Sequence, residues 1–324
     1  MNSIFKDPFN DLLSKKRTFI MGCTMIAIML FHQPFFYDNY VVTFFHLFGH
    51  WGVDVFLLVS GFGVVNSLCK NTTKQYYKNR VNRIVPTCIF VGLCKCILMQ
   101  IGFVNFTAYN DNYFLILTEL ALWYIYAIVV YYTIAPYIYR MLIRYKHWVV
   151  LGACLLAFVM SYIPFGSCSI YLVNRIGWVI ERLPAFIFGM YIASNPISSK
   201  FTKYLVGGGV LPLMVCVVLR ITGITGHGRV IYLILLLALP MLCVIASILA
   251  QWLKCIKLDG VVEYFGKTSL ELYLWHEFIF LNFSTNEMFA GLHVWIQFVA
   301  AVSISLLLAH LTYILKRQIP PIFK

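Results

Sequence analysis

The sequence predicts an all-α membrane protein, a bundle of about ten transmembrane helices with both termini in the cytoplasm. Composition is the first observation behind this prediction. Of the 324 residues, 61% are hydrophobic and 11% are charged, whereas a soluble domain carries about 25% charged and about 45–50% apolar residues. A water-soluble fold could not hide so much apolar surface, so lipid must be its solvent. Residues 1–324 are expected to form a single integral membrane domain.

The second observation is that apolar runs long enough to cross a bilayer, about 20 residues each, recur along the whole chain. A polar stretch ending in Lys15-Lys16-Arg17 precedes the first run, and no small-residue cleavage site follows it. We therefore expect a retained span and not a signal peptide. The predicted spans lie near residues 18–37, 50–69, 84–104, 114–139, 148–165, 170–193, 204–220, 230–252, 264–285 and 293–315.

The distribution of basic residues predicts the orientation. A net charge of +13 could indicate nucleic-acid binding in a soluble protein. With a cytoplasmic N-terminus, however, only Arg220 and Arg229 of the 25 Lys and Arg residues fall outside, and Lys95, Arg175 and Arg182 lie within spans. The positive-inside rule explains this bias. We expect a multi-pass protein of the cell membrane, the inner membrane of a bacterium, in contact with the lipid bilayer and with no nucleic-acid partner.

Ionisable side chains are unusually frequent within the predicted spans. Each costs on the order of 2.5–3.5 kcal/mol on the insertion scale, so such residues usually serve a site or a pair. Their number predicts a polar cavity inside the bundle. The residues are His32, Asp54, Lys95, Glu119, Arg175, Glu181, Arg182, Glu271, His276, Glu277 and His310.

His32 is the candidate general base. It lies fifteen residues after Arg17, about 22 Å along a helix. A neutral imidazole can take a proton from a hydroxyl near neutral pH, because its ordinary pKa is about 6.5. The alternative is a histidine that is only hydrogen-bonded to a neighbouring helix.

His46, His50 and Asp54 follow one another at i+4 spacing and could share a metal on a single helix. Gly49 and Gly52 interrupt that helix, so we expect no metal.

Two pairs of charged residues, one of two arginines and one of a glutamate and an arginine, can each be interpreted in two ways. Arg80 and Arg83 share a helix face and could clamp a phosphorylated ligand, or they could anchor the chain to lipid headgroups. Glu181 and Arg182 precede Pro184 and could neutralise each other or belong to a site.

Taken in order, several motifs resemble the acyltransferase-3 family of membrane O-acyltransferases over nearly the whole chain. They are A-I-M-L-F-H ending at His32, G-V-D-V-F-L-L-V-S-G-F (52–62), N-R-V-N-R-I-V-P (79–86), L-W-Y-I-Y-A with Tyr and Pro following (122–136), E-R-L-P-A-F-I-F-G-M (181–190) and G-K-T-S-L-E-L-Y-L-W-H (266–276).

The resemblance implies transfer of an acyl group, commonly acetyl from acetyl-CoA, to a sugar hydroxyl. It implies that His32 is catalytic and that Arg80 and Arg83 hold the acyl-CoA. Ser60 and His276 match further family positions. One position departs: the family's arginine eleven residues before the histidine is Met21 here, and the nearest arginine is Arg17, one turn away. Either Arg17 substitutes for it, or the chain belongs to a subfamily with a different donor or acceptor contact.

Together these observations predict an O-acyltransferase in which His32 deprotonates an acceptor hydroxyl. Asp54 or Glu181 is expected to orient the imidazole of His32. Arg80, Arg83 and Ser60 are expected to bind the acyl donor. His276 and Trp123 are expected to bind the acceptor, a surface carbohydrate or a lipid-linked glycan. Acetyl-CoA or another acyl-CoA is the expected donor, and attack can be direct or pass through an acyl-histidine. The main alternative is a transporter or flippase of a lipid-linked glycan, and a non-enzymatic scaffold is a third.

Overall fold

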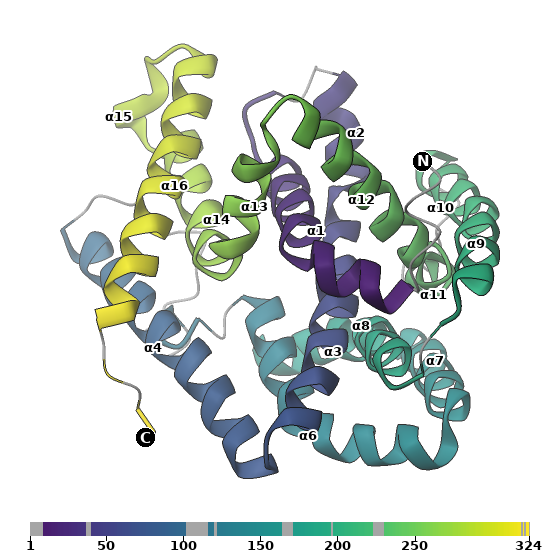
Figure 1. Ribbon diagram of the computed structural model, residues 1–324. Helices are drawn as coiled ribbons and strands as arrows, with labels where there is room; N and C mark the ends of the chain where they lie inside the picture. The colour runs from purple at the N-terminus through teal and green to yellow at the C-terminus, as the bar shows by residue number, and fades with distance from the viewer. Residues whose placement is uncertain are drawn as a thin grey trace.

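The computed structural model describes residues 9–36, 40–101, 116–119, 122–163, 171–195, 197–222, 230–318, 320 and 322–323. Almost all of this part of the chain is helical, and it contains no strand. Figure 1 shows the helices packed side by side around α1 and α3. The prediction of an all-α bundle is therefore confirmed.

Helices follow one another along the described chain. The first half contains α1 (Phe9–His32), α2 (Tyr40–Phe48), the 3-10 turn η1 (Gly49–Trp51), α3 (Gly52–Lys70), α4 (Thr73–Gln100), α6 (Trp123–Tyr145) and α7 (His147–Ser161). The second half contains α8 (Tyr171–Ser194), α9 (Ser199–Gly208), α10 (Val210–Thr222), α11 (Ile231–Leu236), α12 (Leu239–Cys255), α13 (Asp259–Lys267), α14 (Ser269–Thr285), α15 (Glu287–Ala290) and α16 (Val294–Gln318).

Each of the ten predicted spans contains at least one of these helices. Six described helical segments are long and apolar enough to cross a membrane, and α7 and α12 are apolar but shorter. The six are Val42–Lys70, Thr73–Gln100, Trp123–Tyr145, Ile176–Ser194, Ser199–Thr222 and Val294–Gln318. The predicted count of about ten exceeds these six because α1 begins with several charged residues and α14 has only 17 residues.

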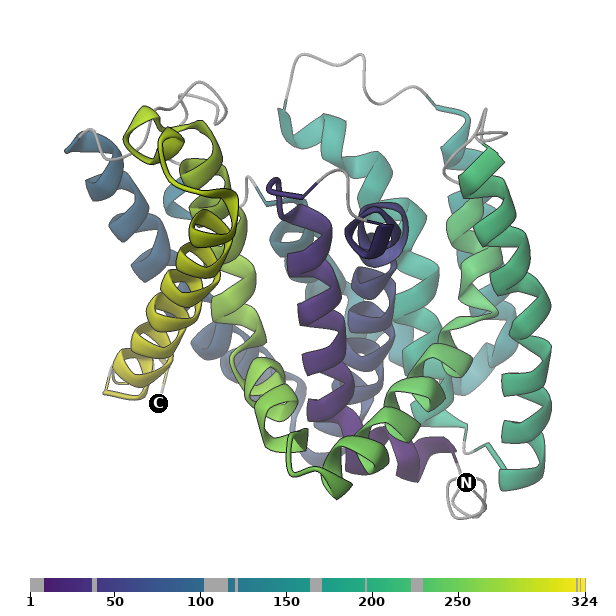
Figure 2. The ribbon, with the colours of Figure 1, turned by 90° about the horizontal axis from the view of Figure 1, so that it is seen from above.

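The outer faces of the bundle are apolar, as a lipid solvent requires. Large hydrophobic side chains such as Leu155, Leu211 and Ile221 are exposed on peripheral helices. In water such a surface would be an aggregation liability. Figure 2 shows that the start of α1 (purple) and the end of α16 (yellow) both lie toward the same, lower side of the bundle.

Glycines allow the central helices to approach closely. α3 packs on α8, and a Cβ at Gly61 would overlap the carbonyl oxygen of Phe186, while one at Gly189 would overlap that of Leu58. This contact fixes α3, which carries Asp54 and Ser60, against α8, which carries Glu181 and Arg182.

We expect Gly189→Ala to destabilise the protein, because the added methyl group must push α3 and α8 apart. Overpacking of this kind costs about 1–3 kcal/mol, which lowers the melting temperature by roughly 2–10 °C for a chain of this size. Thermal unfolding in detergent measures the shift. Gly152→Ala is the matched control, since nothing lies within 4 Å of a Cβ there, and an equal shift in both variants would contradict the packing argument.

Candidate functional site

A polar cavity lies inside the bundle, as the ionisable residues predict. Its volume is about 540 Å³, and we call it the chamber. Its wall is formed by residues of α1, η1, α3, α6, α8, α10, α11 and α14. The polar and aromatic residues that line it are His32, His50, Trp123, Trp178, Glu181, Arg182, Arg220, Tyr232, Tyr273 and Glu277.

His32, at the end of α1, meets His276 of α14 beside this chamber. Nε2 of His276 lies 3.2 Å from Nδ1 of His32, and the ring centroids are 5.0 Å apart. His276 is buried, whereas His32 lines the chamber. The sequence places these residues 244 positions apart, so only the fold brings them together.

The hydrogen-bond network assigns the proton positions on both rings. Nδ1 of His276 lies 3.0 Å from the carbonyl oxygens of Leu272 and Tyr273, so it must carry the proton, because a carbonyl only accepts. Its Nε2 is then an acceptor. Nδ1 of His32 donates to that atom and to the carbonyl oxygen of Ile28, 3.0 Å away. The lone pair of His32 is therefore on Nε2.

Asp54 binds Arg182 and not an imidazole. The carboxylate accepts a hydrogen bond of 2.6 Å from the guanidinium, and both residues are buried. The guanidinium also lies 4.0 Å from the centroid of the Tyr232 ring and 4.9 Å from that of Trp123. The sequence left open whether Arg182 is neutralised by Glu181; its ion-pair partner is Asp54. Glu181 is buried and lines the chamber.

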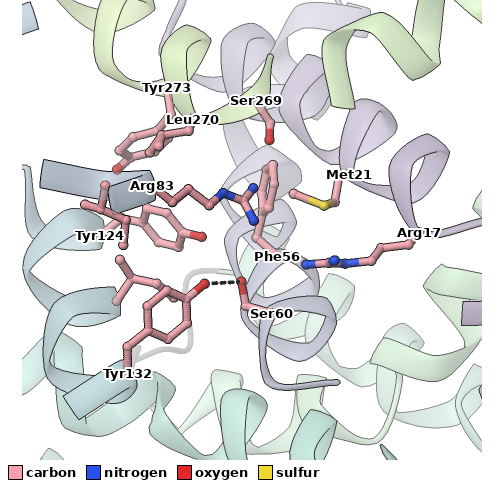
Figure 3. A pocket seen from close by; sticks show the side chains of 12 residues that line it. Arg17, Met21, Phe56, Ser60, Arg83, Tyr124, Tyr132, Ser269, Leu270 and Tyr273 are labelled. Atoms are coloured by element: carbon pink, nitrogen blue, oxygen red, sulfur yellow. Dashed lines mark hydrogen bonds between the residues drawn. The ribbon is translucent and has the colours of Figure 1, made fainter. Parts of the chain in front are cut away.

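A second, smaller cavity of about 50 Å³ lies between α1, α3, α4, α6 and α14. We call it the basic pocket. Figure 3 shows Arg17 and Arg83 pointing into it from opposite sides, with Ser60 bonded to Tyr132 at 3.5 Å. None of the described residues that line it is acidic. Two unneutralised guanidinium groups around one cavity favour an anionic ligand.

The predicted donor residues are partly brought together there. Arg83 and Ser60 line the basic pocket. Arg80 does not line it but lies beside it, 4.7 Å from the centroid of the Tyr132 ring.

Arg17, which the sequence offered as one candidate to replace the family's arginine, lines the basic pocket. Its guanidinium lies against Gly63, where a Cβ would be 2.8 Å from Nη2. Tyr124 and Tyr132 also line the pocket. The sequence did not identify these two tyrosines as site residues, and only the motif at residues 122–136 that contains them indicated this region.

Tyr273 connects the two cavities, because it lines both of them. Its ring lies 4.9 Å from that of Tyr124 in the basic pocket and 5.6 Å from that of His276. On α1, Met21 lines the basic pocket and His32 the chamber. The eleven positions that separate Met21 from His32 correspond to about 16 Å of helix.

The side chains of His46, His50 and Asp54 do not come together as a metal site in the described structure. η1 interrupts the helix at Gly49–Trp51, as the glycines predicted. Nε2 of His46 lies 2.8 Å from the carbonyl oxygen of Gln33, and Asp54 is held by Arg182. Among the described residues, no three His, Cys, Asp or Glu side chains could hold a metal ion.

Other ionisable residues inside predicted spans form pairs away from both cavities. Lys95 binds Glu119 at 2.9 Å in a buried pair. Glu271 binds Lys316 at 3.3 Å between α14 and α16, whereas His276 contacts His32 of α1. The hydroxyl oxygen of Tyr264 lies 2.6 Å from Nδ1 of His310. The side chain of Arg175 lies outside the described residues. These pairs position helices and do not line the site.

An imidazole pair beside a polar chamber inside the helical bundle, with a basic pocket next to it, has the character of an enzyme active site. Residues 20–314 match the family described as an acyltransferase domain. The chain therefore belongs to the acyltransferase-3 family and is an O-acyltransferase. No curated protein matches the chain. No solved structure matches it.

Proposed function

We propose that this enzyme transfers an acyl group, acetyl in the simplest case, from acyl-CoA to a hydroxyl of a surface or lipid-linked carbohydrate, with His32 as general base. The observation that supports this most strongly is the hydrogen-bond chain from His276 through His32. It leaves one basic nitrogen, Nε2 of His32, at a cavity large enough for a sugar.

The basic pocket is the proposed donor site. Arg17 and Arg83 would bind the phosphates of acyl-CoA, assisted by Arg80, since guanidinium groups pair with phosphate through two parallel hydrogen bonds. Ser60 would contribute a hydroxyl. The thioester arm would then extend past Tyr273 into the chamber, where His32 lies.

The chamber is the proposed acceptor site. Its aromatic walls suit the apolar faces of a sugar ring, and Trp123 and Trp178 lie edge to face at 5.9 Å. Glu181, Glu277 and the Arg182–Asp54 pair offer hydrogen-bond partners for hydroxyl groups. His276 is assigned here to positioning His32, in place of the direct substrate contact that the sequence suggested.

In the proposed reaction, His32 takes the proton of the acceptor hydroxyl on Nε2 while the oxygen attacks the thioester carbonyl. The carbon–sulfur bond then breaks, and His32 returns the proton to the departing thiolate. Nδ1–H of His32 remains bonded to Nε2 of His276 throughout. That bond stabilises the imidazolium while it exists, the task that a carboxylate performs in many catalytic triads.

For the topology, we propose about ten crossings with both termini in the cytoplasm of a bacterial cell. The distribution of Lys and Arg supports this orientation, as does the common side of the start of α1 and the end of α16 (Figure 2). α1, α7, α12 and α14 would complete the bundle, with Arg17 of α1 at the basic pocket and Glu277 of α14 at the chamber. The basic pocket would then open toward the cytoplasm, where acyl-CoA is made.

A labelled donor separates this proposal from the alternative of a glycan transporter. Purified protein in liposomes is supplied with [¹⁴C]acetyl-CoA and a lipid and polysaccharide extract of the source cells. We expect alkali-labile label in the carbohydrate fraction and free CoA in equal amounts. Intact acetyl-CoA, together with movement of glycan across the liposome membrane, would contradict the proposal and identify a transporter.

A further inference from the structure

An apolar groove adjoins the chamber on the side of α1, α2, α10 and α12. Its volume is about 420 Å³, compared with the roughly 150 Å³ of an apolar cavity that accommodates benzene. No charged side chain is among the described residues that line it, which include Ile20, Ala27, Phe45, Val217, Leu242 and Ala246. A groove of this size and character accommodates a length of hydrocarbon chain.

The groove lies beside the chamber, because neighbouring residues of two helices line the two cavities. On α1, residues from Ile20 to Ala27 line the groove, and residues from Ile28 to His32 line the chamber. On α10, Leu213 and Val217 line the groove, and Arg220, one turn later, lines the chamber. An elongated ligand could therefore occupy both cavities, with its apolar part in the groove and its polar part in the chamber.

The border between the two cavities carries polar atoms without partners. Nε of Arg220 and Nδ1 of His50 are buried, and neither has a hydrogen-bond partner in the described structure. Gly49 and Gly52, which flank His50, line the groove, whereas His50 itself lines the chamber. Buried polar atoms are normally hydrogen-bonded, and a guanidinium beside an imidazole suits the oxygens of a phosphate.

We propose that the acceptor is a lipid-linked sugar phosphate. Its lipid chain lies in the groove, its phosphate lies between Arg220 and His50, and its sugar extends into the chamber toward His32. This inference rests on the proposed function and assigns the class of acceptor. A soluble oligosaccharide would leave the groove and the Arg220 guanidinium without a role, so the amphipathic acceptor accounts for more of the site.

Photocrosslinking tests the groove without requiring turnover. The full-length protein in phosphatidylcholine nanodiscs is mixed with farnesyl phosphate that carries a diazirine on its chain, irradiated, digested and mapped by mass spectrometry. We expect saturable adducts on the groove segments of α1, α10 and α12. Ala246→Trp fills the groove and should remove most of these adducts, whereas Leu155→Trp, on an exposed face of α7, should not.

The phosphate contact is tested with the same probe and the matching diazirine farnesol. Arg220→Gln should weaken the phosphate probe about tenfold and leave the alcohol unchanged. Arg144→Gln, exposed on α6, is the control. Adducts spread evenly over the lipid-facing helices, or equal binding of phosphate and alcohol, would overturn the inference.

A parallel acetyl-CoA assay keeps the two proposals distinguishable. If Ala246→Trp and Arg220→Gln acylate the native acceptor at the wild-type rate, the groove inference fails while the transferase proposal stands. If the groove binds the probe as expected but His32→Ala turns over acetyl-CoA normally, the proposed chemistry fails and the lipid site remains.

Discussion

Replacing His32 with alanine should lower acyl transfer by about 10²–10⁴-fold, the usual contribution of a positioned general base. The physical reason is that Nε2 of His32 is the basic atom that the hydrogen-bond network leaves available at the chamber. The measurement is release of CoA from acetyl-CoA by purified variants, with size-exclusion and thermal unfolding as checks of folding. Wild-type turnover in a correctly folded His32→Ala protein would eliminate this residue as the base.

Variants of His276 separate its positioning role from a structural one. His276→Leu cannot accept the Nδ1 proton of His32 and should reduce kcat about tenfold or more. His276→Gln offers an amide oxygen and should recover part of that loss. The KM for acyl-CoA should stay near the wild-type value in both variants, since His276 does not line the basic pocket. A raised KM with unchanged kcat would indicate substrate contact instead.

Removing the charge of Arg17 and Arg83 together should have the second large effect. Arg17→Gln with Arg83→Gln leaves Tyr124, Tyr132 and Ser60 in place but removes the two cations of the basic pocket. Because charge-assisted hydrogen bonds contribute about 1.5–3 kcal/mol each, we expect the KM or Kd for acyl-CoA to rise at least about 100-fold. Isothermal titration or binding of a fluorescent CoA analogue measures the change.

Two further variants sharpen that experiment. Arg140→Gln changes an arginine of α6 that stacks on Tyr137 away from the pocket, so it should bind acyl-CoA normally. Gly63→Ala keeps every charge but places a methyl group 2.8 Å from Nη2 of Arg17. If the position of Arg17 matters, this change should weaken donor binding on its own. Unchanged affinity in the double arginine variant would remove the basic pocket from the donor site.

The fold was largely predictable because its signals are local. Long apolar runs indicate membrane helices by themselves, and Gly49 and Gly52 indicated the break that η1 forms. The number of helices that cross the membrane was harder to predict from the sequence. α1 begins with Lys15, Lys16 and Arg17, and α14 combines 17 residues with Glu271, His276 and Glu277, so apolar length alone does not define them.

The candidate site was predictable in composition but not in its pairings. Intramembrane charges indicated a polar cavity, yet they could not show that Asp54 binds Arg182 or that Lys95 binds Glu119. Those contacts join residues far apart in sequence, and either partner is chemically acceptable for several others. The His32–His276 contact likewise depends on how α1 and α14 cross. Arg17 lies one turn from the family's usual position, where Met21 stands, so the sequence left open whether it takes the place of the family's arginine.

The contact between His32 and His276 bears on the cost of inserting the helices that carry them into a membrane. A carboxylate partner would carry a permanent negative charge, and an aspartate at the centre of a membrane helix costs about 2.5–3.5 kcal/mol on insertion. With one proton on each ring, as the hydrogen bonds assign them, the imidazole pair carries no net charge and adds no such cost to the helices that hold it. In the proposed mechanism, neither α1 nor α14 has to carry a carboxylate as the partner of His32.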